Sequence, residues 1–429
     1  MYRPDLETAP PDVIRERQLA RLNELLSRIL PRNAFYAGKF GALTLPLSWP
    51  AYHALPFTTK ADLVADQDAS PPLGTIATYP PEGYVTYHQT SGTTGRPLAI
   101  LDTPESWDWW VECWQYVYAA AGVTARDRIF FAFSFGPFIG FWSAYAAACR
   151  LGAMTIPGGG LDSKARLQLL QNSQADVLVC TPTYGLRLAE VARAEGIPIR
   201  DSAVRVTIHA GEPGASIPSV RSRIEEAWGA ASFDHAGGTE VGAYGFSCEA
   251  RDGVHVNEAE FIAEVLDPVT GQPCAEGAAG ELVITNLGRA GWPAIRYRTG
   301  DIVAVGTRAC RCGRTFLTFP GGIIGRTDDL IVLRGVNVYP SAIEAIVRTF
   351  EIEEFRMVRT RNGALDELTV EIEVAGGRQA SGKPGDLVAD KLAKAFRERL
   401  AVRIPTRAVP AGSLPRWDLK AKRLVDARA

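Results

Sequence analysis

Short apolar runs that alternate with helical stretches constrain the fold of this chain more than any other feature. The runs cover residues 129–133, 153–156, 177–180, 204–208 and 231–233. Helical stretches such as 184–195 and 218–228 lie between them. Buried strands separated by helices are typical of a parallel sheet with crossover helices. The pattern therefore predicts an α/β body.

The loops after three of these runs are polar and rich in glycine. They span Thr181–Tyr184, His209–Pro213 and Asp234–Glu240. In open α/β sheets the ligand binds outside the carboxyl ends of the strands. We therefore expect these three loops to converge on one site.

A run of hydroxyls and glycines, HQTSGTTGRPLAI at residues 88–100, precedes the α/β body. A loop of this kind can fold its backbone N–H groups around phosphate oxygens, and the hydroxyls and Arg96 would complete the cradle. The run lacks the Gly-Lys-Ser/Thr ending of a Walker loop, so the mononucleotide P-loop fold is not its natural host. On this stretch alone, an ordinary surface turn remains the alternative interpretation.

The character of the chain changes after residue 250. Residues of about 250–320 are rich in short β segments, which predicts a small barrel-like or antiparallel subdomain. Beyond them, strands at 334–338, 355–359 and 368–374 and a helix at 387–400 predict an α+β unit of about a hundred residues.

Composition excludes several classes of partner. The 46 Lys and Arg residues nearly balance the 48 Asp and Glu residues, so a net charge of -2 favours neither nucleic acid nor an anionic membrane. No apolar run approaches the length of a membrane span, and no secretory leader pattern is present. Seven cysteines fit reduced thiols better than a disulfide framework. We therefore expect a cytoplasmic protein.

Seven motifs follow one another over nearly the whole chain. They are LPFTTK at 55–60, SGTTGRP at 91–97, AGEP at 210–213, GGTEVG at 237–242, YRTGD at 297–301, GRTDDLIVLRGVNVYPSAIE at 325–344 and LPRWDLKAKR at 414–423. With these motifs the chain resembles the adenylate-forming superfamily, and within it the phenylacetate-CoA ligase branch. The resemblance implies an N-terminal adenylation domain at 1–326 and a small mobile lid domain at 327–429.

The resemblance also implies a reaction in two steps. A carboxylate attacks the α-phosphorus of ATP, which releases pyrophosphate and leaves an acyl-adenylate. A thiol, usually that of coenzyme A, then captures the acyl group. The first step joins anions, so the site must neutralise and align its reactants more than supply a base. ATP, Mg²⁺ and coenzyme A are the cofactors and co-substrates that this reaction needs.

The same resemblance assigns the nucleotide contacts. The β- and γ-phosphates would be held by Ser91, Gly92, Thr93, Thr94, Gly95 and Arg96. Arg96 stands where the family usually has lysine, and its planar guanidinium grips two oxygens at once. The residues implied to flank adenine are Gly211, Glu212, Pro213, Asp234 and His235. Asp301 would accept both ribose hydroxyls, with support from Arg326.

Three residues carry the implied chemistry. Thr239 would contact the α-phosphate, and Glu240 would bind Mg²⁺, because a hard cation prefers carboxylate and phosphate oxygens. Lys420 would stabilise the approach of the carboxylate and the charge that develops on phosphorus. Lys422 and Arg423 are close neighbours, and the spacing from Pro415 and Arg416 favours Lys420. Asp328 matches the hinge of the lid domain.

A separate set of residues suits zinc. Cys310 and Cys312 lie in one tight turn, and Cys248 and His255 bracket another, so together they form a Cys3His ligand set for a structural ion. Four protein ligands leave no open position for catalysis. Reduced cysteines beside an unrelated histidine are the alternative interpretation.

The stretch FFAFSFGPFIGFW at 130–142 is unusually aromatic, and some of its rings must be core. In the family this region lines the acyl pocket. The pocket residues implied here are Phe135, Phe138, Trp142, Ala210 and Gly237. Flat rings favour an aryl or arylacetic acid.

Two rival functions follow from the same residues. The chain could be a stand-alone adenylating enzyme that passes its acyl group to a separate carrier protein or to an amine. A non-catalytic nucleotide-binding scaffold is a rival from another class, motivated by Arg96 and opposed by the joint presence of Glu240, Asp301 and Lys420. The identity of the acid is not readable, and a homodimer is an expectation of the resemblance alone.

Overall fold

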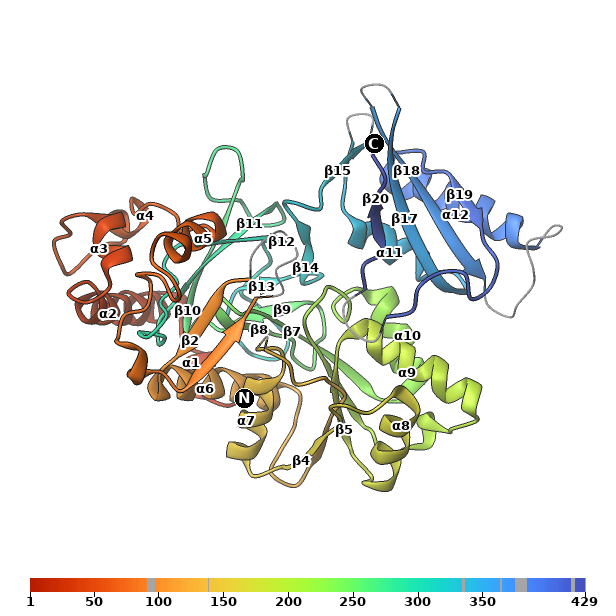
Figure 1. Cartoon of the computed structure of the whole chain (residues 1–429), viewed down its shortest axis with the longest axis horizontal. Helices are drawn as coiled ribbons and strands as arrows, with labels where there is room; N and C mark the ends of the chain where they lie inside the picture. Colours follow the sequence, from red (N-terminus) through yellow and green to blue (C-terminus); the bar gives the residue numbers. More distant parts are fainter. Residues whose placement is uncertain are drawn as a thin grey trace.

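The computed structural model describes residues 1–90, 97–137, 139–333, 336–362, 365–374, 384–417 and 421–428. They form a large α/β body that ends at β14 and a smaller α+β unit that follows it, which is drawn in blue in Figure 1. The fold class predicted from the sequence is confirmed.

The main sheet of the body has the strand order β13-β9-β8-β7-β6-β5-β3-β4. Its parallel half consists of β3 (Arg128–Phe131), β4 (Met154–Pro157), β5 (Val177–Cys180), β6 (Val206–His209) and β7 (Ala231–Gly238). The antiparallel half adds β8 (Gly242–Phe246), β9 (Val254–Val256) and β13 (Thr318–Phe319).

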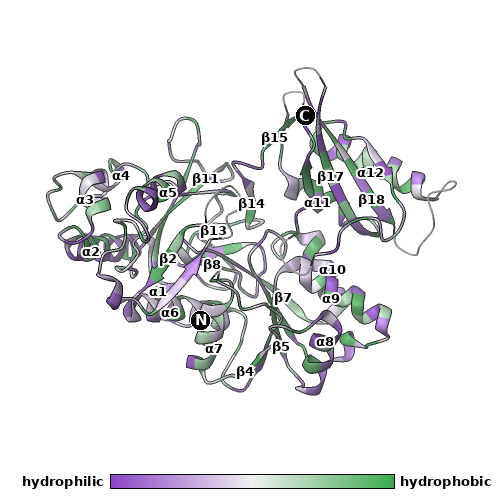
Figure 2. Cartoon of the chain, viewed as in Figure 1, coloured by the Kyte–Doolittle hydropathy of each residue, from purple (hydrophilic) through white to green (hydrophobic). Residues whose placement is uncertain are grey.

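Helices alternate with the parallel strands, as the sequence predicts. They are α6 (Pro104–Ala120), α7 (Trp142–Leu151), α8 (Ser163–Asn172), α9 (Pro182–Glu195) and α10 (Pro218–Trp228), with the short turn η2 (Ile199–Asp201). Figure 2 shows apolar and polar residues interspersed along α8 and α9, as expected for helices that cover a sheet with one face. Their apolar residues join those of β5 in one buried cluster that includes Leu178, Leu188 and Trp228.

The N-terminal part packs beside this sheet. It contains α1 (Pro4–Glu7), α2 (Pro11–Ile29), α3 (Ala34–Phe40), α4 (Trp49–His53), α5 (Lys60–Ala69), η1 (Pro81–Gly83) and the hairpin of β1 (Thr86–Gln89) and β2 (Ala99–Asp102). An antiparallel sheet follows, with the order β10-β11-β12-β14. Its strands are β10 (Phe261–Leu266), β11 (Ala279–Asn286), β12 (Tyr297–Ala304) and β14 (Ile323–Arg326). The segment expected to form a β-rich subdomain, about 250–320, contributes β10, β11 and β12 to this sheet, whereas its strands β9 and β13 belong to the main sheet.

The C-terminal unit has a core of its own, which runs from Ile331 to Ile404. Its elements are β15 (Ile331–Leu333), β16 (Val336–Val338), α11 (Pro340–Val347), β17 (Ile352–Asn362), β18 (Leu365–Val374), α12 (Pro384–Leu400), β19 (Thr406–Ala408) and β20 (Leu424–Asp426). The main sheet of the unit has the order β19-β18-β17-β20.

One predicted loop is wrong. Residues 234–238 belong to β7, because this strand changes partner along its length. It pairs in parallel with β6 through Asp234 and then antiparallel with β8 from His235 onward. The loop at this edge is therefore shorter than expected and begins at Thr239.

Candidate active site

The carboxyl ends of β5 and β6 place two of the predicted loops side by side. Thr181 caps α9 by accepting a hydrogen bond from the Tyr184 backbone N–H at 3.2 Å. Glu212, in the loop after β6, accepts the Thr183 backbone N–H on Oε1 at 2.9 Å. The first N–H groups of a helix have no partner within the helix, so this carboxylate satisfies one of them. Burial raises the pKa of Glu212, while Thr183 and Arg423 oppose that shift.

Asp234 and His235 lie next to this loop, within β7. The Asp234 carboxylate accepts the Ser216 backbone N–H at 3.0 Å, and burial raises the pKa of Asp234 to about 6. The His235 Nδ1 lies 2.7 Å from the Gly245 carbonyl, and its ring packs 4.3 Å from that of Trp114. Burial lowers the pKa of His235 to about 4, so the ring is neutral at pH 7.

A buried ion pair contacts the backbone of the Thr239–Glu240 loop. Arg289 pairs with Asp102 at 2.7 Å, and both side chains are fully buried. The Arg289 Nη1 also donates to the backbone carbonyls of Thr239 at 2.9 Å and Glu240 at 3.2 Å. The guanidinium therefore fixes the backbone of the two residues that the sequence assigns to the α-phosphate and Mg²⁺.

The Glu240 carboxylate itself remains partly exposed, with 16% of its side chain accessible. Its Oε1 lies 3.7 Å from the Lys60 ammonium, at the start of α5. Tyr297 lies beside Glu240. Burial, together with the Glu240 carboxylate, raises the pKa of Tyr297 well above its usual value. A hard carboxylate oxygen facing an open, charged region fits the donor type that Mg²⁺ prefers.

Asp301 and Arg326 face each other across β12 and β14. They are register partners, and the Arg326 Nη1 donates to Asp301 Oδ1 at 2.9 Å. Tyr244 donates to the other carboxylate oxygen at 3.3 Å. Burial raises the pKa of Asp301 to about 6, although Arg326 pulls it down. Asp328, the predicted hinge residue, is exposed and accepts a hydrogen bond from the Arg326 Nε at 2.9 Å.

The predicted phosphate loop, residues 91–96, lies outside the described residues. Its two ends are held together, because the Thr90 N–H donates to the Leu98 carbonyl at 3.1 Å and the Leu98 N–H donates to Thr90 Oγ1 at 3.0 Å. These bonds extend the pairing of β1 and β2 by one step beyond Gln89 and Ala99.

The aromatic segment at 130–142 contacts the last residue of β1. The Gln89 N–H donates to the Pro137 carbonyl at 2.6 Å. Phe135 is half-buried and meets Trp142 edge to face at 4.7 Å. Ala210 is buried at the end of β6, whereas Gly237 is exposed in β7. Phe138 lies outside the described residues.

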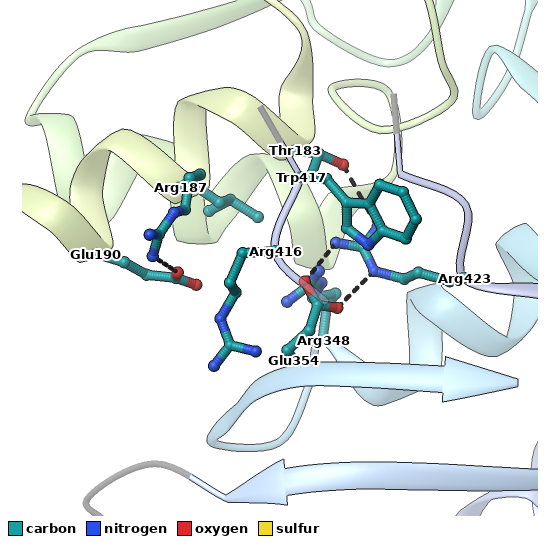
Figure 3. A pocket seen from close by; sticks show the side chains of 9 residues that line it. Thr183, Arg187, Glu190, Arg348, Glu354, Arg416, Trp417 and Arg423 are labelled. Carbon is teal, nitrogen blue, oxygen red and sulfur yellow. Dashed lines mark hydrogen bonds and ion pairs between the residues drawn. The ribbon is translucent and has the colours of Figure 1, made fainter. Parts of the chain in front are cut away.

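The C-terminal unit reaches the same edge of the sheet. Lys420 lies outside the described residues, but its neighbours Trp417 and Ala421 do not. The Ala421 backbone N–H donates to Glu212 Oε2 at 3.0 Å. Figure 3 shows Trp417 and Arg423 beside Thr183, with Arg423 bonded to Glu354 of its own unit.

Cys248, His255, Cys310 and Cys312 form a compact cluster. Their ligand atoms all lie within 4.8 Å of one another. The Cys248 and Cys310 sulfurs are 3.7 Å apart, and the Cys312 sulfur is 3.5 Å from the His255 Nε2. A tetrahedral zinc ion separates two thiolates by about 3.8 Å and a thiolate from an imidazole nitrogen by about 3.6 Å. The His255 Nδ1 faces the Phe316 carbonyl at 3.3 Å, which leaves Nε2 free to bind a metal.

The chain is similar to known proteins over both of its units. The family model of AMP-binding enzymes matches residues 47–289, and that of the AMP-binding enzyme C-terminal domain matches residues 335–428. The chain belongs to the AMP-binding enzyme family. It is 32% identical to the phenylacetate-coenzyme A ligase of Thermus thermophilus over the full length of both chains. The same identity to the Escherichia coli phenylacetate-coenzyme A ligase covers 99% of this chain and 97% of that protein.

Solved structures of one ligase in two states match this chain to different degrees. A 2-hydroxyisobutyryl-CoA ligase in the postadenylation state, in complex with 2-HIB-AMP, matches with a TM-score of 0.93 and 31% identity, covering 99% of this chain and 91% of that one. The same ligase with 2-HIB-AMP and CoA in the thioesterification state gives 0.74, with 32% identity over 99% and 92% of the two chains. The present arrangement of the two units therefore resembles the postadenylation state.

Some site residues have no counterpart in the sequence-based assignment. Asp102 and Arg289 are 187 positions apart, and neither lies within a recognised motif. The motifs assign no role to Lys60 or Tyr244, although Lys60 is the last residue of LPFTTK. The isolated charges of Asp102, in an otherwise apolar strand, and of Arg289 were the available signals.

Proposed function

We propose that this chain is an ATP-dependent carboxylic acid–CoA ligase that works through an acyl-adenylate. The observation that carries the proposal is the meeting of both units at one edge of the main sheet. There the Glu240 loop follows β7, the segment next to Lys420 contacts Glu212 after β6, and the Asp301–Arg326 pair lies close enough for the Glu240 charge to act on Asp301. Pyrophosphate leaves in the first step, and the CoA thiol takes the acyl group in the second.

The chemistry follows from the charges that these side chains present. Glu240 would hold Mg²⁺, which supplies charge neutralisation for the phosphates of ATP. Asp301 orients the ribose as a hydrogen-bond acceptor, and Thr239 meets the α-phosphate. Lys420 supplies a cation to the attacking carboxylate. These groups align two anions, which is the main requirement of nucleotidyl transfer.

We assign the site to two domains that divide after Arg326, with Asp328 as the hinge. The separate cores of the body and of the C-terminal unit support this division. The exposed position of Asp328, in the segment between β14 and β15, also supports it.

The substrate class is an aryl or arylacetic acid. The edge-to-face pair of Phe135 and Trp142 supports a flat acyl group, as do the names of the phenylacetate-CoA ligase relatives. A short branched hydroxy acid is the second candidate, because the matching 2-hydroxyisobutyryl-CoA ligase is 31% identical to this chain, against 32% for the phenylacetate-CoA ligases.

ATP–pyrophosphate exchange tests the proposal directly. Purified protein with Mg²⁺ and without CoA is offered aryl, arylacetic and short hydroxy acids. Exchange with phenylacetate or a related acid is the expected result. Exchange with hydroxy acids alone would overturn the substrate class, and ATP binding without exchange across the panel would favour the scaffold alternative.

The acceptor is tested on the enzyme loaded with its acyl-adenylate. We expect free CoA to be acylated. Transfer only to a phosphopantetheinylated carrier protein, or to an amine, would replace CoA as the acceptor. The homodimer that the resemblance implies is a separate prediction, which light scattering of the purified protein would test.

The Cys3His cluster is proposed to bind one structural zinc ion, supported by spacings that fit tetrahedral coordination. Protein purified without added zinc should contain about one equivalent by elemental analysis. Cys310→Ser should lose the metal and lower the melting temperature. Cys149→Ser, at an exposed cysteine outside the cluster, is the matched control. Less than a tenth of an equivalent in the native protein would contradict the site.

No described helix is long and apolar enough to cross a membrane.

A further inference from the structure

Glu212, in the loop that the sequence assigns to adenine, contacts both units of the protein. Its two carboxylate oxygens are both engaged by backbone N–H groups, and the two donors come from different units. The Thr183 N–H, from the first turn of α9, meets Oε1 at 2.9 Å. The Ala421 N–H, one residue after Lys420, meets Oε2 at 3.0 Å.

We propose that Glu212 is a positioning residue that docks the Lys420 segment for adenylation and has no role in the CoA step. The proposal rests on the ligase function proposed above. A carboxylate accepts hydrogen bonds at both oxygens and donates none, so it can hold two backbone N–H groups at once. The isosteric amide can accept only on one side, because its nitrogen would face an N–H donor.

The second anchor of the same segment lies two residues further on. Arg423 is 6% exposed, and its guanidinium binds Glu354 at 2.7 Å and Glu344 at 3.1 Å within the C-terminal unit. Its Nη1 also reaches Thr183 Oγ1 at 3.4 Å, across the interface (Figure 3). Thr183 is thus shared by both anchors: its N–H binds Glu212 and its hydroxyl accepts from Arg423.

The docking contact belongs to one arrangement of the two units. The chain matches the postadenylation state of the 2-hydroxyisobutyryl-CoA ligase with a TM-score of 0.93 and its thioesterification state with 0.74. A rotation of the C-terminal unit between such states would carry Ala421 away from Glu212, because their bond crosses the interface. Loss of the bond should therefore slow adenylation selectively.

The test measures the two half-reactions separately in wild type and Glu212→Gln. Acyl-adenylate formation is followed in a single turnover without CoA, and thioester formation is followed from synthetic acyl-adenylate supplied with CoA. We expect adenylation to fall about ten- to hundredfold, as for the loss of a hydrogen bond to a charged group, with thioester formation unchanged. The dissociation constant of ATP should also be unchanged, which separates positioning from adenine contact.

Two further variants keep the result interpretable. Ala421→Pro removes the donor and leaves Glu212 intact, so it should slow the same step, and the double variant should be no slower than the worse single variant. Glu190→Gln is the matched control. It changes another half-buried glutamate of this interface, but one whose carboxylate binds Arg187 on the same helix at 3.2 Å.

The possible outcomes separate a failure of the positioning role of Glu212 from a failure of the proposed ligase function. A wild-type protein that neither adenylates an acid nor transfers a supplied acyl group would refute the ligase function. With an active wild type, equal loss of both half-reactions in Glu212→Gln would overturn the positioning role. Weakened ATP binding, or additive effects of Glu212→Gln and Ala421→Pro, would overturn it as well.

Discussion

The two halves of the site are held in place by different means. Arg289 and Asp102 support the Glu240 loop from within the α/β body, and both side chains are fully buried. Arg423 and Glu212 support the Lys420 segment across an interface, where Thr183 and Ala421 come from different units. The first pair is part of the folded body, whereas the second depends on how the two units are placed.

Mutations of a pair within one unit and of a contact between two units should change different measured quantities. Breaking a buried ion pair inside a domain leaves one charge without solvent or partner, so the cost appears in the free energy of unfolding. Breaking a contact between two units that have separate cores leaves both units folded, so the cost is expected in the rate of one step. We call the half supported by Arg289 and Asp102 the fixed half, and the half supported by Arg423 and Glu212 the docked half. Mutations in the fixed half should change stability and nucleotide binding, and mutations in the docked half should change adenylation alone.

The largest effect is expected from Arg289→Met. It leaves the Asp102 carboxylate buried and unpaired, which should reduce the free energy of unfolding by about 3–5 kcal/mol in denaturant titrations. The double variant Asp102→Leu with Arg289→Met buries no lone charge and should recover most of that stability. It should still adenylate slowly, because the Thr239 and Glu240 carbonyls lose their donor. Full recovery of adenylation in the double variant would show that the pair is only structural.

The docked half is probed by Lys420→Ala. Removal of a cation from the reacting centre should lower acyl-adenylate formation about hundred- to thousandfold. Thioester formation from supplied acyl-adenylate and the melting temperature should both stay at the wild-type value. Lys422→Ala is the matched control, since Lys422 is exposed two positions further on. A larger loss in Lys422→Ala would move the catalytic assignment to that residue.

The fixed half was also the easier one to predict from the sequence. Strand β5 and helix α10 have the boundaries that apolar periodicity indicates, and parallel topology alone brings their loops to one edge. The four metal-ligand candidates gather within 4.8 Å, as their residue types predicted, although the metal itself stays a prediction.

The remainder depends on contacts that periodicity does not encode. The change of partner along β7 follows from the presence of β8, which local apolar pattern does not reveal. The Asp102–Arg289 pair joins residues 187 positions apart. Glu212 illustrates the limit best: its motif indicates a nucleotide loop, but its bond to Ala421 exists only when two separately folded units meet.

A pH titration of ATP binding should give a smaller effect, in the fixed half. Burial raises the pKa of Asp301 from 3.8 to about 6, so the folded protein binds this proton more tightly than the unfolded chain. This group therefore adds stability as pH falls from 7 towards 4, whereas ribose binding needs the ionised carboxylate. By calorimetry, ATP affinity should fall about tenfold per pH unit below about 6. Asp301→Asn should bind ATP weakly at all pH values and lose this dependence. The control Asp328→Asn, at an exposed carboxylate on the same Arg326, should retain it.

The smallest effect is expected from single hydrogen bonds that neutral hydroxyl side chains make across the interface. Thr183→Val removes the hydroxyl that accepts from Arg423 at 3.4 Å and keeps the backbone N–H that binds Glu212. Ser219→Ala removes a second crossing bond, from the Ser219 hydroxyl to the Ala345 carbonyl at 2.8 Å. Each should slow single-turnover adenylation about two- to tenfold, with Thr183→Val at the lower end because its bond is long.

The control for both is Ser173→Ala, whose hydroxyl binds the Leu169 carbonyl within the body at 2.7 Å. It should leave the adenylation rate at the wild-type value, because its bond does not change when the units separate. If Thr183→Val and Ser219→Ala slowed thioester formation as much as adenylation, the interface would be a permanent part of the fold. The contrast between a fixed and a docked half would then disappear, because Glu212 and Arg423 would support the site in the same way as Asp102 and Arg289.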